Sequence, residues 1–517
     1  MTLQGYLLAP DIKLNALKAM LQKQLGCVAR RPHSYACYYL DSIDRRLYQQ
    51  HLYLQADQLE NGIHLQLFSL ATHKLLSQTL CERLPNSVKE LPNSRLLTLL
   101  KPILENRSII PLLKLKITRH PMEIVDTEQK NIAQLNLEIA QLTSPKPRQI
   151  ARTLWHHTTQ NDQETNQKIK QALAQQIAIS PMQQSLFEQI LSQITLQPQY
   201  SLSKQIIPLH PQQRSDDALR ALLTYLIEIA ESQRPCTLQD LDPECLHSIR
   251  IAARRSRSLL SALPQVIPQR QQQRLLKGFK KLGDVTTPLR DLDIILQQFS
   301  NYRSLLPLKK RHVLEPARQQ VLQQRQHAHL ALCKYLNSYA YRQFTNVTQR
   351  FLQAPPPKRT LLLNAQRPIL QLADERIWKA YKKVITAGKS IDQHSAPETL
   401  HTLRKQCKKL RYLMDLFSTL YPESKLKQLI KILKKLQDNL GEYQDLNVHI
   451  KHLNTLHNEM SNTHKVDKKL AHAFKQIHHL LEERQVEFRS HFLSYFADFN
   501  TSRNSHRFEQ LFNRLLK

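Results

Sequence analysis

Residues 243–250 read PECLHSIR, and residues 397–404 read PETLHTLR, so the chain repeats one motif 154 residues later. The match continues without a gap to residues 291–294, DLDI, whose counterpart at residues 445–448 reads DLNV. A register kept over this length predicts an internal duplication. Each copy runs on into a basic segment, with Arg254, Arg255 and Arg257 in the first and Lys408, Lys409 and Arg411 in the second.

Each copy of the motif is predicted to begin an amphipathic helix. In the first copy Asp242 is a suitable N-cap, Pro243 suits the first helical position, and Glu244 complements the helix dipole. Basic side chains then recur at intervals of three and four residues, which places them on one helix face ~80° wide. The basic face consists of His247, Arg250, Arg254 and Arg257 in the first copy and of His401, Arg404, Lys408 and Arg411 in the second.

The basic faces are best interpreted as anion-binding surfaces. The chain has 74 Lys and Arg against 42 Asp and Glu, a formal charge of +32, which indicates a polyanionic partner. Like charges at i,i+3 and i,i+4 repel, and neither basic face carries a carboxylate to offset that cost. Guanidinium and ammonium groups in such a row suit a chain of phosphates. A second cationic row follows each copy, formed by Lys277, Lys280 and Lys281 and by Lys431, Lys434 and Lys435.

Composition narrows the class of protein. The glycine spacing of residues 278–283 resembles a P-loop, but Asp284-Val285 follows where Lys-Ser/Thr is needed, so we reject a P-loop. The seven cysteines are scattered without a Cys-x-x-Cys pair, which favours reduced thiols over a disulfide framework or a zinc site. The sequence lacks a signal-peptide pattern and an apolar stretch of ~18–20 residues. We therefore expect a soluble cytoplasmic protein.

The chain is expected to fold as an α+β domain followed by an all-α domain. Period-two alternation at residues 51–55, 63–67, 113–117 and 132–138 is typical of antiparallel strands, and Asn61-Gly62 predicts a hairpin. Residues 11–25 have helical spacing, and the proline-containing residues 144–147 predict a break. The expected boundaries are 1–140 for the α+β domain, 141–210 for a helical connecting segment, 211–500 for the all-α domain and 501–517 for a C-terminal helix. Within the all-α domain we expect two halves, 211–354 and 358–500, joined by a linker at Pro355-Pro356-Pro357.

The two His-x-x-Arg-x-x-x-[Arg/Lys]-[Arg/Lys]-x-Arg segments, each followed by an acidic Asp-Leu-[Asp/Asn]-[Ile/Val] motif, resemble the CHAD family, the conserved histidine α-helical domain. The resemblance implies two pseudo-symmetric helical bundles around a basic cleft that binds inorganic polyphosphate. Asp291 and Asp445 are expected to orient basic side chains or to cap helices rather than to touch the ligand. Gln444 stands where the first copy has Arg290, so the halves are expected to contribute unequally. The binding residues implied are His247, Arg250, Arg254, Arg255, Arg257, Lys277, Lys280, Lys281, His401, Arg404, Lys405, Lys408, Lys409, Arg411, Lys431, Lys434 and Lys435, with Asp291, Asp445 and Tyr412 in supporting positions.

The first domain resembles the CYTH family, the triphosphate tunnel fold, through residues 38–47 and the alternating strands that follow. That family opens with Glu-x-Glu-x-Lys, whose carboxylates help to hold a divalent metal, whereas residues 3–7 here read LQGYL. The strand expected to carry Leu-Arg-x-Arg reads LYLQ at residues 52–55. Lys114, Lys116 and Arg119 remain candidates for phosphate contact or for a solvated strand face. We therefore expect a degenerate CYTH-like domain without triphosphatase activity.

The leading hypothesis is a non-catalytic protein that binds inorganic polyphosphate, in the cytoplasm and at polyphosphate granules. It includes no catalytic residues, no metal site and no cofactor. The alternatives are a triphosphatase or polyphosphate-processing enzyme that uses the first domain, and a nucleic-acid-binding protein. Nucleic acid is the weaker candidate because aromatic residues, at 6%, do not interleave with the basic runs. A membrane surface is disfavoured because the basic helices carry no Trp or Phe belt.

Overall fold

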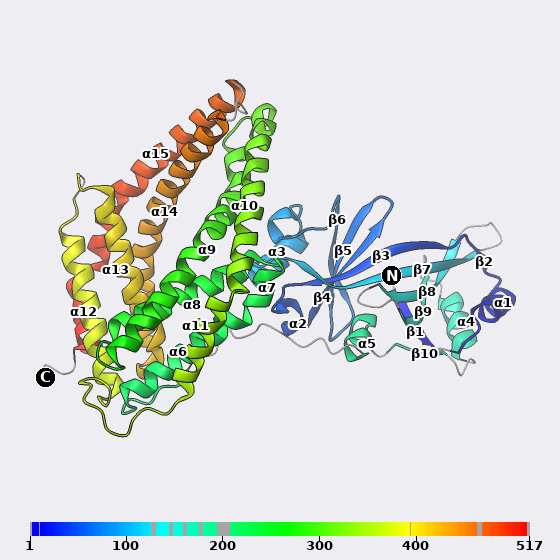
Figure 1. Cartoon of the computed structure of the whole chain (residues 1–517). Helices are drawn as coiled ribbons and strands as arrows, with labels where there is room; N and C mark the ends of the chain where they lie inside the picture. Colours follow the sequence, from blue (N-terminus) through cyan, green and yellow to red (C-terminus); the bar gives the residue numbers. More distant parts are fainter. Residues whose placement is uncertain are drawn as a thin grey trace. The chain divides into compact units, whose positions relative to one another are not determined.

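The computed structural model describes residues 3–9, 11–125, 131–143, 148–158, 163–174, 179–182, 184–193, 207–392, 394–462 and 468–513. The chain divides into two compact units between Ser201 and Leu202. The first unit is built on a sheet and the second on helices, as Figure 1 shows. This confirms the expected fold class, an antiparallel α+β domain followed by an all-α region. The break expected at residues 144–147 lies outside the described residues.

The described residues of the first unit form one ten-stranded sheet in the order β10-β1-β9-β8-β7-β3-β4-β5-β6, with β2 paired to β7. Its strand pairs are antiparallel, and alternating apolar side chains such as Leu65 and Leu67 point into the core. The strands are β1 Leu3–Leu8, β2 Val28–Ala29, β3 His33–Asp41, β4 Leu52–Leu59, β5 Gly62–Ser69, β6 Leu75–Cys81, β7 Ile110–Val125, β8 Asn131–Leu142, β9 Arg148–Thr158 and β10 Ile179–Pro181.

The predicted hairpin between β4 and β5 is confirmed. Leu59 pairs with Gly62 at the turn, and Gly62 has a φ of 129°, a conformation that L side chains rarely adopt. A Cβ atom at this position would also meet the backbone oxygen of Cys81 at 2.9 Å. The turn therefore needs glycine for two independent reasons.

The prediction of a helical connecting segment over residues 141–210 is wrong in part. Arg148–Thr158 forms β9, which lies between β1 and β8 in the sheet, and Ile179–Pro181 forms β10 at its edge. Pairing with two neighbours, rather than local helix propensity, decides the structure of β9. The segment does contain two helices, α4 Gln163–Ala174 and α5 Leu186–Gln193. Its residues 194–206 lie outside the described part of the chain.

The other helices of the first unit are short. The helix expected within residues 11–25 is α1 Leu14–Leu25, which buries Leu17 and Leu21. Leu96, Leu100 and Leu104 form the buried face of α3, at four-residue spacing. The remaining elements are α2 Arg46–Gln49, η1 Val88–Glu90 and α3 Arg95–Leu104.

The elements described in the second unit are helices, joined by loops and by one isolated bridge between Arg214 and Pro368. The linker expected around residues 355–357 lies between α11 and α12. No described helix is both long enough and apolar enough to cross a membrane. The first half contains α6 Ser215–Ser232, α7 Arg234–Leu238, α8 Pro243–Ala262, α9 Gln269–Ser304, η2 Leu308–Leu314, α10 Glu315–Leu336 and α11 Tyr339–Gln353. The second half contains α12 Ile369–Lys389, α13 Pro397–Leu416, η3 Ser418–Leu420, α14 Glu423–Asn462, α15 Lys468–Phe499 and α16 Ser502–Phe512.

The duplication is visible in the backbone. The helix pairs α6/α12, α8/α13 and α9/α14 each begin 154 residues apart. The segments before α6 and α12 also pair with each other: Ser215 N donates to the Arg367 oxygen at 3.0 Å, and Ile369 N donates to the Gln213 oxygen at 2.9 Å. A shift of 154 residues exchanges these two hydrogen bonds. The halves are therefore related by a pseudo-two-fold axis, as expected.

The two halves share one hydrophobic core. Ile249 of α8 and Leu403 of α13, which are counterparts in the duplication, are both fully buried in it. A smaller cluster, which includes Phe299 and Phe474, holds the far ends of the long helices α9, α10, α14 and α15 together. Because the core crosses the axis, α8 and α13 are packed in fixed relation to each other.

Candidate anion-binding site

The two motif helices form as their sequences predict. Asp242 caps α8 by accepting a hydrogen bond from Glu244 N at 2.9 Å, and Pro243 is the first helical residue. Pro397 takes the same place in α13, but Ala396 precedes it and supplies no side-chain cap. The apolar faces of both helices are buried in the shared core, which leaves their basic faces on the other side.

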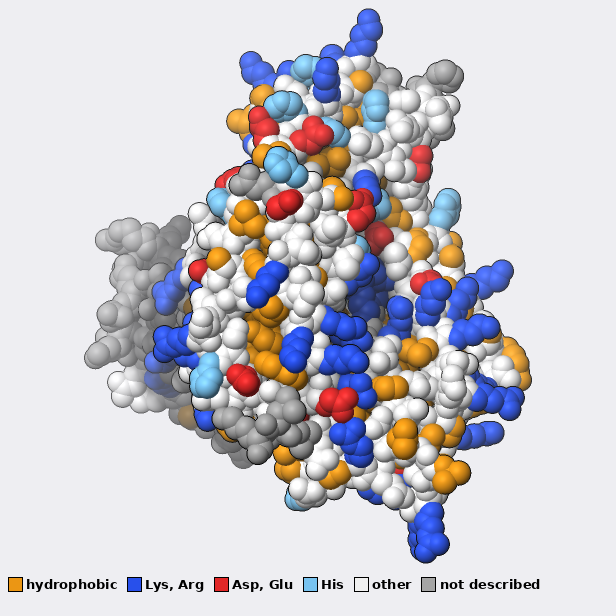
Figure 2. Space-filling view, turned by 90° about the vertical axis from the view of Figure 1, so that its left-hand side faces the viewer, with side chains coloured by type: hydrophobic (Ala, Val, Ile, Leu, Met, Phe, Trp, Pro, Cys, Tyr) orange, Lys and Arg blue, Asp and Glu red, His pale blue; other side chains and the backbone are white. Residues whose placement is uncertain are grey.

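Basic residues from both halves meet where α8 and α13 approach each other. Arg254 of α8 and Lys408 of α13 are counterparts in the duplication, and each lies within the electrostatic reach of the other. The group, here named the central cationic cluster, consists of His247, Arg250 and Arg254 of α8, Arg290 of α9, and Arg404 and Lys408 of α13. In Figure 2 Lys and Arg side chains gather around a hollow in the middle of the face shown.

Burial, together with repulsion between neighbouring cations, lowers the pKa values of several members of this cluster. Burial lowers the pKa of His247 to about 4, with further lowering by Arg290, Arg254, Arg250 and Lys408. Since the reference value is ~6.5, His247 is neutral at physiological pH.

Lys408 shows the same effect. Burial lowers its pKa to about 8, and the charges of Arg404 and Arg254 lower it further, although Asp445 opposes the change. The cluster therefore carries positive charge that the protein itself does not fully compensate.

In the first half, the basic side chains are anchored by uncharged oxygens and one glutamate. Arg250 is only 6% exposed and donates to the Gly283 oxygen at 3.2 Å and to the hydroxyls of Thr286 and Thr287 at 3.0 and 2.8 Å. Arg290 forms an ion pair with Glu244 at 3.3 Å. Arg250 is thus held in the wall of the site.

The second half uses different partners at the matching positions. Gln444, the counterpart of Arg290, lies 2.9 Å from His401 Nδ1, and Arg404 contacts Asp445 at 3.2 Å. The contact of Asp445 agrees with the expectation that this acidic residue orients a basic side chain. Asp291 also lies near cations. Burial raises the pKa of its carboxyl, and the charges of Arg250, Arg254 and Arg290 oppose that rise. The expected inequality of the halves is therefore present in these contacts.

Two of the predicted binding residues share one carboxylate, and one of these two ion pairs joins the halves. Arg255 of α8 and Arg411 of α13 both approach Asp415, at 3.6 and 3.7 Å, and Arg255 also lies over the ring of Tyr412 at 5.9 Å. Asp415 lies one helical turn beyond Arg411, just past the segment in which the sequence showed no carboxylate. It joins α8 to α13 and leaves these two arginines less available to a ligand.

The remaining predicted residues lie outside the central cluster. Lys409 is half-buried, and burial lowers its pKa. The cations that lower this pKa further belong to α12 rather than to α8. The other predicted residues are exposed on α8, α9, α13 and α14 and make no ion pair within the described part of the chain. They are Arg257, Lys277, Lys280, Lys281, Lys405, Lys431, Lys434 and Lys435.

Sequence reasoning missed several residues that build the site. Arg290 was noted only as the counterpart of Gln444, and Glu244 only as a residue that complements the helix dipole. Thr286 lies four residues before Arg290, so the helical period could have placed both residues on the face of α9 that meets α8. The role of Asp415 has no local signal, since it depends on how α13 packs against α8.

In the first unit, the candidate phosphate contacts are separated. Lys114 and Lys116 are exposed on β7, but Arg119 forms an ion pair with Glu138 of β8 at 2.7 Å and donates to the Tyr35 hydroxyl at 2.8 Å. Burial raises the pKa of Glu138, and the charge of Arg119 opposes that rise. This carboxylate is therefore used by an internal ion pair. Among the described residues, no group of three or more His, Cys, Asp or Glu is arranged to hold a metal ion.

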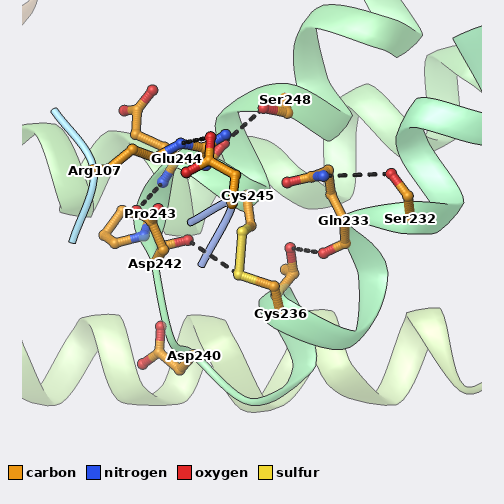
Figure 3. Close-up of a disulfide and its surroundings, with 12 residues drawn as sticks. Arg107, Ser232, Gln233, Cys236, Asp240, Asp242, Pro243, Glu244, Cys245 and Ser248 are labelled. Carbon is orange, nitrogen blue, oxygen red and sulfur yellow. Dashed lines mark hydrogen bonds and ion pairs between the residues drawn. A yellow bond between two sulfur atoms is a disulfide. The ribbon is translucent and has the colours of Figure 1, made fainter. Parts of the chain in front are cut away.

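The expectation that the cysteines are free thiols is wrong for two of them. Cys236 of α7 and Cys245 of α8 form a disulfide, which Figure 3 shows beside the N-cap Asp242. Their separation of nine residues matches no recognised pattern, and only the turn between α7 and α8 brings their Cα atoms to 6.1 Å. Cys27, Cys37, Cys81, Cys333 and Cys407 are free.

Comparison with protein families finds one match. The family model described as the CHAD domain matches residues 220–454, which run from α6 into α14. Among curated proteins, the uncharacterized protein Rv2226 of Mycobacterium tuberculosis is 24% identical over 251 residues. The matched region is 48% of this chain and 47% of that protein, so the chain spans about half the length of the relative.

Solved structures are similar to each of the two units. The CHAD domain from the plant Ricinus communis has a TM-score of 0.47 and 21% identity, covering 57% of this chain and 95% of its own. HpAC1 from Hippeastrum, described as having a dominant triphosphatase activity, has a TM-score of 0.28 and 13% identity, covering 38% and 97%.

Proposed function

We propose that this protein binds inorganic polyphosphate in the central cationic cluster, without a catalytic step, in keeping with the match of residues 220–454 to the family model described as the CHAD domain. The observation that carries the proposal is the pairing of Arg254 with Lys408 near the pseudo-two-fold axis, among further cations of both halves. Burial, and after it the charges of Arg404 and Arg254, lower the pKa of Lys408 to about 8, and a ligand with closely spaced negative charges would offset the repulsion among these cations.

The chemistry of the site favours a phosphate chain over a single small anion. Its cations come from α8, α9 and α13, so a ligand must offer charge along its length to meet them all. Glu244, Asp291 and Asp445 neighbour the cluster but are fewer than its cations. Each phosphate can accept hydrogen bonds from guanidinium and ammonium groups, and no base recognition is required.

The triphosphatase alternative receives less support. Glu138, a carboxylate in the interior of the sheet unit, is engaged by Arg119. Residues 3–7, where the metal-binding carboxylates of a CYTH enzyme are expected, read LQGYL. Phosphate release from tripolyphosphate in the presence of Mg²⁺ or Mn²⁺ would contradict the non-catalytic assignment. The proposal also includes a location in the cytoplasm and at polyphosphate granules, where such a ligand is stored.

A competition assay tests the ligand class. Labelled long-chain polyphosphate is bound to the full-length protein at near-physiological salt, and unlabelled polyphosphate, single-stranded RNA and duplex DNA are added at equal phosphate concentration. We expect polyphosphate to displace the label at much lower concentration than either nucleic acid does. Equal displacement per phosphate would overturn the proposal, because it would show a general phosphodiester site.

A further inference from the structure

The second half carries a row of cations that is absent from the first. Arg376, Lys379 and Lys383 of α12 are spaced 0, 3 and 7, so they lie on one helix face. Lys405 and Lys409 of α13 are four residues apart and also share a face. The helices α12 and α13 pack side by side (Figure 1). We name these five residues the α12–α13 patch.

Contacts within this patch go beyond those of an ordinary solvated surface. Lys409 is half-buried, and burial together with the charges of Lys383 and Arg376 lowers its pKa. The side chain of Arg376 is only 16% exposed, and its Nε has no acceptor in the part of the chain that the structure describes. Glu375 contacts Arg376 at 3.4 Å but is shared with Arg367 at 3.1 Å. Positive charge here is held in place and poorly compensated.

The matching region of the first half has the opposite character. The counterparts of Arg376, Lys379 and Lys383 are Leu222, Tyr225 and Ile229 of α6, which belong to or pack against the hydrophobic core. Packing alone therefore does not require cations on this face.

The counterpart of Lys409 is Arg255, which is neutralised by Asp415. Ser261 stands where a matching acid would have to be, at the position equivalent to Asp415. Comparison of the halves thus shows that these cations of α12 have no cationic counterparts in α6, and that Lys409, within the described residues, lacks the acidic partner that Arg255 has.

We propose that the α12–α13 patch is a second anion-binding surface, which takes further phosphates of a polyphosphate chain whose other part lies in the central cationic cluster. Lys408 and Lys409 are adjacent residues of α13, and one belongs to each surface. A chain that leaves the cluster at Lys408 can therefore follow α13 to the patch. This inference rests on the proposed function and extends it to a preference for long chains, because the two surfaces act as linked binding sites.

The test compares two probes of different length on the full-length protein. Tripolyphosphate has three phosphates, too few to engage the cations of both surfaces together, whereas long-chain polyphosphate has enough to occupy both. The variant is Arg376→Gln with Lys383→Gln and Lys409→Gln. The control is Lys309→Gln with Lys310→Gln and Lys334→Gln, which removes the same charge from exposed positions of η2 and α10.

We expect the variant to bind long-chain polyphosphate about 10-fold more weakly than the wild type. The slope of log affinity against log salt concentration should become shallower by about two, since each phosphate contact contributes ~0.7 to that slope. The affinity of the variant for tripolyphosphate, and both affinities of the control, stay as in the wild type. Retained long-chain affinity, or an equal loss for both probes, would overturn the inference. If the wild type binds neither probe, the proposed function fails and the inference fails with it.

A second variant guards against an effect of the buried Arg376 on folding. Lys379→Glu with Lys383→Glu reverses charge at two exposed positions. It should give the same selective loss for the long chain, with an unchanged melting temperature. A melting temperature equal to that of the wild type together with unchanged long-chain binding would also refute the patch.

Discussion

The two halves of the helical unit share their packing but not their polar contacts. Ile249 and Leu403 occupy equivalent positions in the common core, and equivalent helices begin in register. By contrast, Arg290 pairs with Glu244 in the first half, while Gln444 at the same position contacts His401 in the second. The duplication thus kept apolar positions at the shared core of α8 and α13, whereas the charged positions around the site differ between the halves.

The largest effect is expected where the halves remain most alike. Replacing Arg254 and Lys408 together by Gln removes one cation of each half near the axis, and polyphosphate affinity should fall about 100-fold, since each charge-assisted contact contributes ~1.5 kcal/mol or more. Binding titrations at constant salt measure this loss. The pair Lys309→Gln and Lys310→Gln removes two exposed charges elsewhere and should change affinity little. Equal losses in both variants would show that only net charge matters.

The next largest effect is expected from the disulfide, which distinguishes the first half from the second. It joins Cys236 to Cys245 in the first half, whereas Ser390 and Thr399 stand at the matching positions of the second. The double variant Cys236→Ser with Cys245→Ser should lower the free energy of unfolding by about 2.5 kcal/mol, as the cross-link closes a short loop. Denaturant titration under oxidising conditions measures the change. The same titration in a thiol reductant should remove the difference, and a wild type unaffected by reductant would contradict this prediction.

Measurements over a range of pH distinguish Lys408 from its counterpart Arg254, because the lysine titrates near pH 8. The pKa of Lys408 is about 8 in the unliganded protein, and a bound anion raises it, so binding above pH 8 requires proton uptake. Affinity should therefore fall by up to ~10-fold per pH unit as pH rises through 8 toward the pKa of the complex. Lys408→Arg keeps its charge, matches Arg254 across the axis, and should show a flatter profile. Identical profiles for both proteins would exclude Lys408 as the titrating group.

The smallest effect is expected from Arg290, a cation of the first half whose counterpart in the second half is the uncharged Gln444. Arg290→Gln removes a cation that lowers the pKa of His247, which is about 4 in the wild type. That pKa should move up toward the reference value of ~6.5, and histidine proton resonances followed by NMR titration would report it. Arg303→Gln changes an exposed arginine farther along the same helix and serves as the control. An unchanged His247 titration in Arg290→Gln would contradict the arrangement of the cluster.

Much of the fold could be predicted because its signals are local. The proline at the start of each motif, the three- and four-residue spacing of basic and apolar positions, and the Asn61-Gly62 turn all act within a few residues. The strand β9 could not be found in the same way, because it forms between β8 and β1 in the sheet. Its pairing with β1, which is distant in sequence, leaves no local signal. The pairing of Cys236 with Cys245 depends likewise on a turn that the sequence does not mark.

The site was predictable as a set of cations but not as an arrangement. The helical period placed Arg254 and Lys408 on basic faces, and the structure brings them together. It could not show that Arg255 and Arg411 share Asp415, or that Lys409 turns toward α12, because both facts depend on the angle between packed helices. Residues on one helical face therefore divide among several surfaces once the neighbouring helices are in place.

The pseudo-two-fold axis has a consequence for the kind of chemistry possible near it. In an isologous arrangement a residue on the axis faces its own copy, so a cation there meets a cation and an acid meets an acid. Arg254 and Lys408 retain this relationship after the duplication. An acid from one half alone can offset charge where the halves meet only by making the halves unequal, as Asp415 does beside Arg255 while Ser261 stands at its equivalent position. The symmetry therefore concentrates charge of one sign where the halves meet, and each later acidic substitution there makes the two halves differ.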